Sequence, residues 1–213
     1  MLNRILKTLL LTDACFIFAA GLFGPIYAIF VENIGGDLLD AGWAWAAFML
    51  TCGVVVFLLS RWENRFKHYE QLIIGGYAMR SIAIFGYIFI SSPMHLMIVQ
   101  VVLGLGEAFT IPAYDALFTT HIDKGDEASR WGDWEAMYYI VTAGSAIIGA
   151  GIATALGFQA LFIMMFGVSI VGLLLSIRLI PEIISKLPKT AAVLLTGKGR
   201  RGKEDAKKVK GRR

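Results

Sequence analysis

Long apolar runs separated by short polar gaps dominate the first 180 residues of the chain. An α-helix needs about 20 predominantly apolar residues to cross the hydrocarbon core of a bilayer, which is about 30 Å thick. Runs of this length predict six membrane-spanning helices, at Leu6–Val31, Gly42–Leu59, Gln71–Ile90, His95–Thr119, Trp134–Leu156 and Phe158–Ile180. The pattern therefore predicts an all-α, polytopic membrane protein in which residues 1–180 form one six-helix bundle.

The pattern changes after the last apolar run. Residues 181–213 are predicted to form a cytoplasmic basic tail, because nine of the seventeen residues from Gly197 to Arg213 are Lys or Arg. Such a segment buries too little apolar surface to fold alone, so we expect it to be disordered. Its favoured contact is anionic lipid of the inner leaflet. A partner protein is a less favoured alternative, and we do not expect nucleic acid.

Basic residues occupy alternate gaps between the apolar runs. Nineteen of the twenty Lys and Arg residues lie at the N-terminus, in the second and fourth gaps, or in the tail, and the other gaps contain none. Positively charged segments stay on the cytoplasmic side of a membrane. We therefore predict a multi-pass protein of the cell (inner) membrane with both termini cytoplasmic. The exception, Arg80, then lies within the third span.

Composition narrows the class of protein further. Hydrophobic residues make up 57% of the chain and charged residues 17%, which leaves no separate soluble domain. The two cysteines lie inside apolar runs, and the three histidines lie at helix ends without metal-ligand spacing. No His lies deep enough in a span to activate a nucleophile. We therefore predict neither an enzyme nor a bound metal or cofactor.

Polar residues recur at seven-residue intervals on two of the spans. Seven residues are close to two helical turns, so residues with this spacing share one side of a helix. The two sets are Asp13, Ala20 and Tyr27 on the first span, and Gln100, Glu107 and Tyr114 on the fourth. Each set predicts a polar stripe on an otherwise apolar helix.

Arg80 and Glu107 both lie near the middle of the bilayer if each residue adds about 1.5 Å along its helix. A charge left alone at that depth is expensive, so we predict that the two residues form an ion pair. A role in a solute or ion pathway and a purely structural pair are both open. The alternative for Asp13 is that it reaches the inner headgroup region. The full set of pathway candidates is Asp13, Tyr27, Arg80, Gln100, Glu107 and Tyr114.

Tryptophan side chains cluster at the ends of the predicted spans. Trp131 and Trp134 lie at the start of the fifth span, and Trp43, Trp45 and Trp62 flank the second. Indole rings favour the membrane–water interface. We therefore interpret these residues as membrane anchors rather than as ligand contacts.

Helix-breaking and small residues mark particular points along the spans. Gly21, Gly24 and Pro25 interrupt the first span, and a basic loop follows the second. The other points are Gly104-Leu105-Gly106 and Ile111-Pro112-Ala113 in the fourth span, Arg130-x-Gly132 before the fifth, Ser145-Ala146-Ile147-Ile148-Gly149-Ala150-Gly151 within it, and Gly157-Phe158 and Phe162 after it. In this order of features, over roughly residues 5–180, the chain resembles the N-terminal half of a major facilitator superfamily transporter.

The chain differs from the usual motifs of that family at three places. Between spans two and three, the family's G-x-x-x-D-R-x-G-R-R is reduced to a basic segment, Ser60–His68. Gln100 stands where many proton-coupled members carry Arg, and Ala146 replaces the Pro of the fifth span. The resemblance implies that loop charges close the cytoplasmic side through ion pairs, with a solvated loop as the alternative. The gating candidates are Arg61, Arg65, Arg130 and Asp133.

The resemblance implies transport of a small solute by alternating access. Full members of the family have two six-span halves, with the substrate site between them, and this sequence carries one such half. We therefore predict a half-size transporter that acts as a homodimer or with a separately encoded second half. A non-transporting membrane scaffold or assembly factor that keeps the fold is the alternative.

Small residues on the fifth span suggest where two copies would meet. Ser145, Gly149 and Ala153 recur every four residues, so one side of this helix is flat. Small side chains allow helices to approach closely in a membrane. We predict helix packing on this face, and a parallel homodimer formed by it and by the second span around Gly53.

Overall fold

The computed structural model describes residues 3–63 and 69–179, and within them the side chains of residues 60–63 are not described. This part of the chain contains helices and no strand, which confirms the predicted all-α fold. The α-helices are α1 (Arg4–Phe23), α2 (Tyr27–Asn33), α3 (Leu38–Glu63), α4 (Tyr69–Gly86), α5 (Pro93–Thr120) and α6 (Glu127–Ser176). Short 3₁₀ turns follow three of them, at η1 (Gly24–Ile26), η2 (Tyr87–Phe89) and η3 (Ile177–Leu179). The predicted basic tail, residues 181–213, lies outside the described residues.

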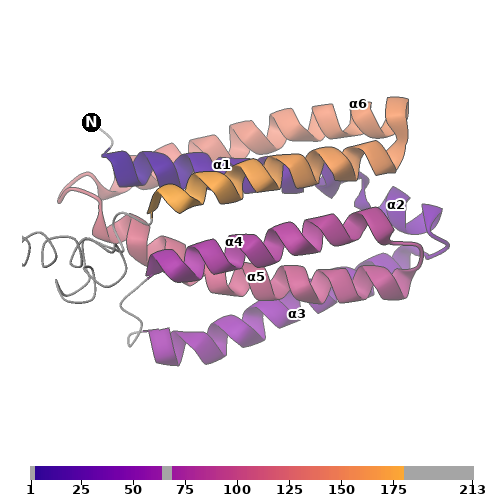
Figure 1. Ribbon diagram of the computed structural model, residues 1–213, viewed down its shortest axis with the longest axis horizontal. Coiled ribbons are helices and arrows are strands. Elements are labelled where there is room, and N and C mark those ends of the chain that lie inside the picture. Colours follow the sequence, from indigo (N-terminus) through magenta and orange to yellow (C-terminus); the bar gives the residue numbers. More distant parts are fainter. Residues whose placement is uncertain (1–2, 64–68, 180–213) are drawn as a thin grey trace, which may run out of the picture. The chain divides into compact units, whose positions relative to one another are not determined.

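Five helices in the described ranges are long and apolar enough to cross a membrane: Arg4–Asn33, Leu38–Leu59, Tyr69–Phe89, Pro93–Thr120 and Glu127–Leu179. The fifth has 53 residues and folds back on itself, as Figure 1 shows for α6. The reversal occurs at Gly157, where φ is 82° and ψ is 171°. Glycine adopts this conformation without the steric cost that a Cβ would impose. The two arms of α6 correspond to the predicted fifth and sixth spans, and the predicted polytopic fold is confirmed.

Local signals in the sequence set the helix boundaries. The Asn3 side chain accepts a hydrogen bond from the Leu6 backbone nitrogen, at 2.9 Å, and so caps α1. Ser92 caps α5, with Pro93 in the first helical turn where a missing N–H costs nothing. The first span is broken at η1, which contains Pro25. The break predicted from Gly21, Gly24 and Pro25 is therefore confirmed.

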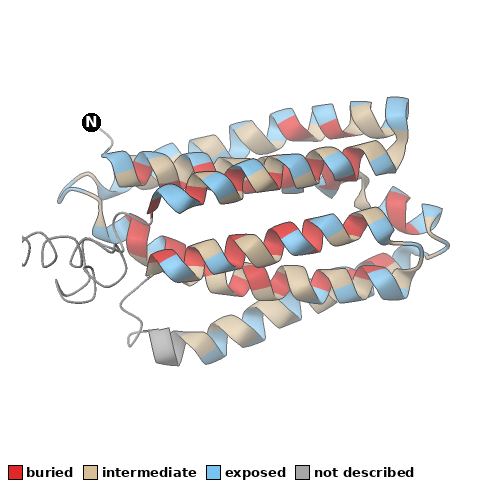
Figure 2. Ribbon diagram, in the orientation of Figure 1, coloured by how far each residue is buried: buried red, intermediate tan, exposed pale blue. Residues whose placement is uncertain are grey.

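α5 occupies a central position because it packs against both α3 and α4. A Cβ added to Gly104 would lie 2.7 Å from the Phe48 carbonyl oxygen of α3, and one on Gly106 would lie 2.9 Å from the Arg80 backbone nitrogen of α4. Gly104 therefore allows α3 to approach α5 closely, and Gly106 does the same for α4. Figure 2 shows the contrast between α4 and α5, which carry many buried residues, and the largely exposed α3.

The helix ends give the bundle an uneven charge distribution. Figure 1 shows that α1 begins, α5 ends, and α6 both begins and ends at the same end of the bundle. Basic residues lie in these helices or in the segments next to them: Arg4, Lys7, Lys124, Arg130 and Arg178. The connection from α2 to α3, at the opposite end, carries one acidic residue, Asp37, and no basic one. The side of the membrane that each end faces stays a prediction from the positive-inside rule.

The flat face of the fifth span packs against α1 of the same chain. Ser145 and Gly149 are both buried. A Cβ on Gly149 would lie 2.7 Å from Leu22 Cα and nearer still to the Leu22 carbonyl group. A Cβ on Gly21 would likewise lie too close to the Ser145 side chain. The prediction that this face contacts a second copy is therefore wrong, because α1 already covers it. On α3, by contrast, the space around Gly53 is open.

Candidate functional site

Two glycines at the crossing of α4 and α5 set the position of the central ion pair. A Cβ on Gly76 would lie 2.7 Å from the Gly106 carbonyl oxygen, so a larger residue at position 76 would separate the helices. Arg80 lies one turn beyond Gly76, and Glu107 directly follows Gly106. Arg80 Nε and Glu107 Oε2 are 3.0 Å apart. The ion pair predicted from their depth in the membrane is confirmed.

Two aromatic rings lie close to the Arg80 guanidinium. Its Cζ atom is 4.7 Å from the centre of the Phe16 ring and 5.7 Å from that of Tyr77. The rings stack on each other with centres 4.2 Å apart. A desolvated guanidinium over a ring face gains about 2 kcal/mol. Neither ring is among the predicted site residues, although Phe16 follows Asp13, and Tyr77 precedes Arg80, by one helical turn.

Asp13 is held by hydrogen bonds from two other helices. The Tyr77 hydroxyl of α4 donates to its Oδ1 at 3.3 Å, and the Trp134 indole N–H of α6 donates to its Oδ2 at 2.9 Å. The alternative that Asp13 extends to the headgroup region is therefore wrong, because the carboxylate is directed into the bundle. Interpreting Trp134 only as a membrane anchor also misses this hydrogen bond.

One member of each predicted polar stripe contacts the other stripe. The Gln100 side-chain nitrogen donates to the Tyr27 hydroxyl at 2.9 Å, and the Tyr87 hydroxyl donates to the Gln100 oxygen at 3.4 Å. Tyr114, at the other end of the α5 stripe, is 4% exposed. Its hydroxyl has no hydrogen-bond partner in the part of the chain that the structure describes. Among the hydrogen bonds of the described residues, the stripes thus meet through Gln100 and Tyr27.

A cavity of about 370 Å³ opens onto the Arg80–Glu107 pair. The Glu107 side chain remains 22% exposed and that of Arg80 10% exposed. The cavity also contains aromatic side chains from several helices: Phe16, Phe23, Trp45, Phe48, Tyr87 and Tyr138. A largely apolar cavity of this size with a few placed charges is typical of a site for a small molecule.

The predicted pathway residues divide into two groups around this cavity. Arg80 and Glu107 line it, together with Ala20 of the α1 stripe. The lining does not include Asp13, Tyr27, Gln100 or Tyr114, which instead pack within the bundle. Trp45, interpreted from the sequence as an anchor, contributes its ring to the wall of the cavity. Sequence spacing alone does not distinguish a buried polar residue from one that faces a cavity.

The loop charges predicted to act in gating form local contacts. Arg130 pairs with Asp126 at 2.9 Å and with Asp133 at 3.0 Å, and each carboxylate lies about one helical turn from Arg130. The two carboxylates remain more than 40% exposed, at 46% and 43%. The Arg61 side chain and all of Arg65 lie outside the described residues. A role of these four residues in gating therefore stays a prediction.

Comparison with known proteins agrees with the resemblance found in the sequence. The family model of the Major Facilitator Superfamily matches residues 9–209. The chain therefore belongs to the Major Facilitator Superfamily, a family of membrane transporters. It is similar to YitZ of Bacillus subtilis (strain 168), an uncharacterized MFS-type transporter, with 27% identity over 145 residues, which cover 68% of this chain and 88% of that protein. No solved structure matches the chain.

Proposed function

We propose that this protein is a half-size transporter that moves a small solute by alternating access. The observation that carries the proposal is the partly exposed Arg80–Glu107 pair on the wall of the central cavity. A buried ion pair adds little stability compared with well-packed apolar residues. Ionisable residues deep in a membrane protein usually mark a pathway for solutes or ions. In this proposal, the pair contacts the solute that enters the cavity.

The bundle described here requires a second bundle to enclose this cavity. Trp45 and Phe48 of α3 line the cavity on one side, and Tyr138 and Thr142 of the first arm of α6 line it on another. If lipid reached the exposed part of Glu107, its unmet hydrogen bonds would cost several kcal/mol. A partner that packs on α3 and the first arm of α6 prevents this contact. The partner is a second copy, related by a two-fold axis, or a separately encoded half.

Two observations support pairing of short chains. Apart from Ala41 and Ala44, the described residues of α3 are not buried within this chain, so the helix has a free face. The 145 aligned residues make up 88% of the Bacillus subtilis relative, so that relative has about the length of one such bundle. Crosslinking in the native membrane tests pairing directly. A protein that remains strictly monomeric there would refute the half-transporter proposal.

Alternating access can be tested without knowing the solute. We replace Cys15 and Cys52 with Ser, and then introduce Thr142→Cys into the cavity wall. A membrane-impermeant thiol reagent should label this position from either face of the membrane, because the cavity opens to each face in turn. The matched control is Ile147→Cys on the same arm of α6, which is 78% exposed on the outside of the bundle and should not be labelled. Labelling of Thr142→Cys from one face only would contradict alternating access.

The alternative function is a membrane scaffold or assembly factor. It is favoured by Gln100, which stands in place of the Arg found in many proton-coupled members and has its side chain satisfied by two tyrosines. It is also favoured by the reduced motif between the second and third spans. A scaffold needs no cavity that opens to both faces. A stable dimer with one-sided labelling of Thr142→Cys would support this alternative.

A further inference from the structure

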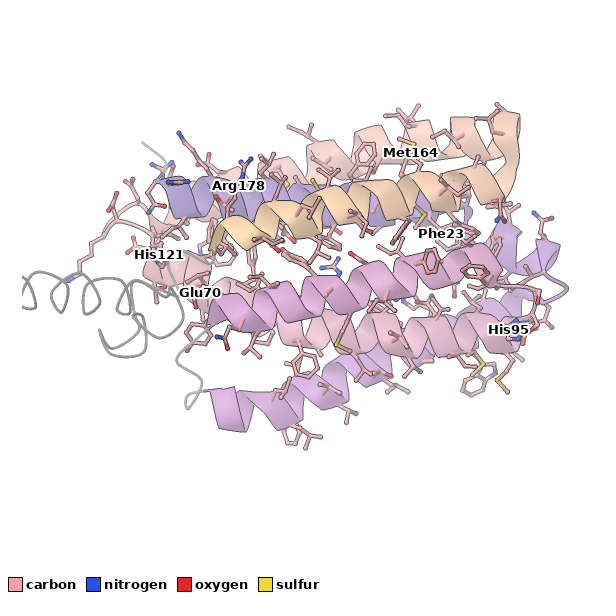
Figure 3. The ribbon with its side chains drawn as sticks, in the orientation of Figure 1. Phe23, Glu70, His95, His121, Met164 and Arg178 are labelled. Carbon is pink, nitrogen blue, oxygen red and sulfur yellow. The ribbon has the colours of Figure 1, made fainter. Side chains whose placement is uncertain are left out.

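A second cavity lies between the start of α1 and the end of α6. Its volume is about 370 Å³, and its lining is Arg4, Lys7, Thr8, Leu11, Leu175 and Arg178. Figure 3 shows Arg178, which lies in η3 just after α6, at the same end of the bundle as the start of α1. The lining contains none of the residues of the central cavity. This cationic pocket is therefore separate from the proposed solute site.

The three cations of the pocket lack a counter-charge in the described structure. Arg4, Lys7 and Arg178 form no ion pair with any described residue, and the lining contains no carboxylate. The nearby Arg130, in contrast, contacts two carboxylates. Three like charges around one hollow repel each other unless an anion lies among them. The pocket thus has the charge of an anion-binding site.

Apolar side chains lie beside the cations on the side toward the membrane interior. Leu11 follows Lys7 by one helical turn, and Leu175 precedes Arg178 by about one turn. Leu11 is 52% exposed, so its surface is free for contact. Charge at the bundle end and apolar surface deeper in the membrane match the order of groups in a phospholipid. A free anion such as phosphate would contact the charged end alone and would leave the apolar surface unused.

We propose that this pocket binds the phosphate of an anionic phospholipid, with an acyl chain along Leu11 and Leu175. Arginine offers paired N–H donors to phosphate oxygens, and lysine adds a point charge. Basic pockets between spans on the cytoplasmic side are suited to anionic headgroups. The bound lipid would connect the first span to the last and so stabilise the bundle. This inference does not depend on transport activity.

The test measures the thermal stability of the full-length protein in detergent as lipid is added. Phosphatidylglycerol should raise the unfolding temperature of the parent protein in a saturable manner, and phosphatidylcholine should not. The pocket variant, Arg4→Gln with Lys7→Gln and Arg178→Gln, should lose this response. Each cation contributes roughly fivefold in affinity, so the three together predict roughly a hundredfold weaker binding. An unchanged response of the pocket variant, or an equal response to phosphatidylcholine, would overturn the proposal.

A control variant distinguishes the pocket from the basic tail. Lys203→Gln, Lys207→Gln and Lys208→Gln remove the same charge from the tail and should leave the saturable response in place. Loss of the response in this variant alone would assign lipid binding to the tail and refute the pocket. Inorganic phosphate separates the two possible sources of the anion: a saturable shift with phosphate as large as that with lipid would show a soluble ligand and overturn the lipid assignment.

A milder variant covers the case in which the pocket variant does not fold. Lys7→Gln keeps two of the three cations and should weaken phosphatidylglycerol binding roughly fivefold. Native mass spectrometry measures this directly as the phosphatidylglycerol retained by the protein. At low lipid concentration the parent should retain more phosphatidylglycerol per molecule than Lys7→Gln, as a roughly fivefold difference in affinity requires. Equal retention would refute a role of the pocket in lipid binding.

Discussion

Replacing Gly149 with alanine tests the close contact between α1 and α6. The added Cβ would lie 2.7 Å from Leu22 Cα, whereas ordinary contact begins at 3.4 Å, so the two helices must separate by at least about 0.7 Å. The obstacle is backbone, which cannot rotate away as a side chain does. The contact between α1 and α6 is the most extensive in the bundle. We therefore expect a clear loss of stability.

The size of the loss follows from the contacts weakened at the crossing. A gap of 0.5–1 Å forfeits about a quarter to a half of the dispersion energy of each atom pair. With the contacts of one buried leucine, about 50 pairs at about 0.15 kcal/mol each, the loss is about 2–4 kcal/mol. Alanine regains about 1 kcal/mol of helix propensity. The net destabilisation should therefore be about 1–3 kcal/mol, as in other overpacked cores.

Titration with sodium dodecyl sulfate in mixed micelles, followed by tryptophan fluorescence, measures this change in unfolding free energy. Gly144→Ala and Gly151→Ala are matched controls on the same arm of α6, because a Cβ at either position meets no atom within 4 Å. Both should be neutral or stabilise by about 1 kcal/mol through helix propensity. If Gly149→Ala is as stable as these controls, the packing of this face against α1 is incorrect.

Three further predictions concern the ion pair, the inner hydrogen bonds and the topology. Arg80→Gln and Glu107→Gln should each destabilise the protein by about 3 kcal/mol or more, because each leaves a buried charge unpaired. The double variant should recover part of this loss in the same unfolding assay, and strictly additive losses would contradict the pairing. Trp134→Phe should cost about 1.5–3 kcal/mol, because it removes a hydrogen bond to the carboxylate on α1; an unchanged unfolding midpoint would refute that bond. In a cysteine-free background, Asp37→Cys and Lys124→Cys should react with an impermeant reagent from opposite faces, and labelling of both from outside would refute the topology.

The sequence by itself determined which segments cross the membrane and where they end. Apolar run length sets each span, and residues with special backbone properties set the boundaries, such as Pro25 in the break of the first span and Gly157 at the reversal of α6. Depth along a helix follows from residue count alone. For this reason the Arg80–Glu107 pair was predictable, since two opposite charges at one depth have few other partners.

Only the tertiary structure decided which side of each helix meets which neighbour. In a membrane, the residues that face lipid and those that face other helices are both apolar, so hydropathy does not specify the rotation of a span about its axis. The flat face at Gly149 fits a second copy of the chain as well as it fits α1, and the structure places α1 there. The partners of Asp13 lie 64 and 121 residues away, on α4 and α6. Their convergence on one carboxylate depends on the packing of three helices, which no spacing within a single span records.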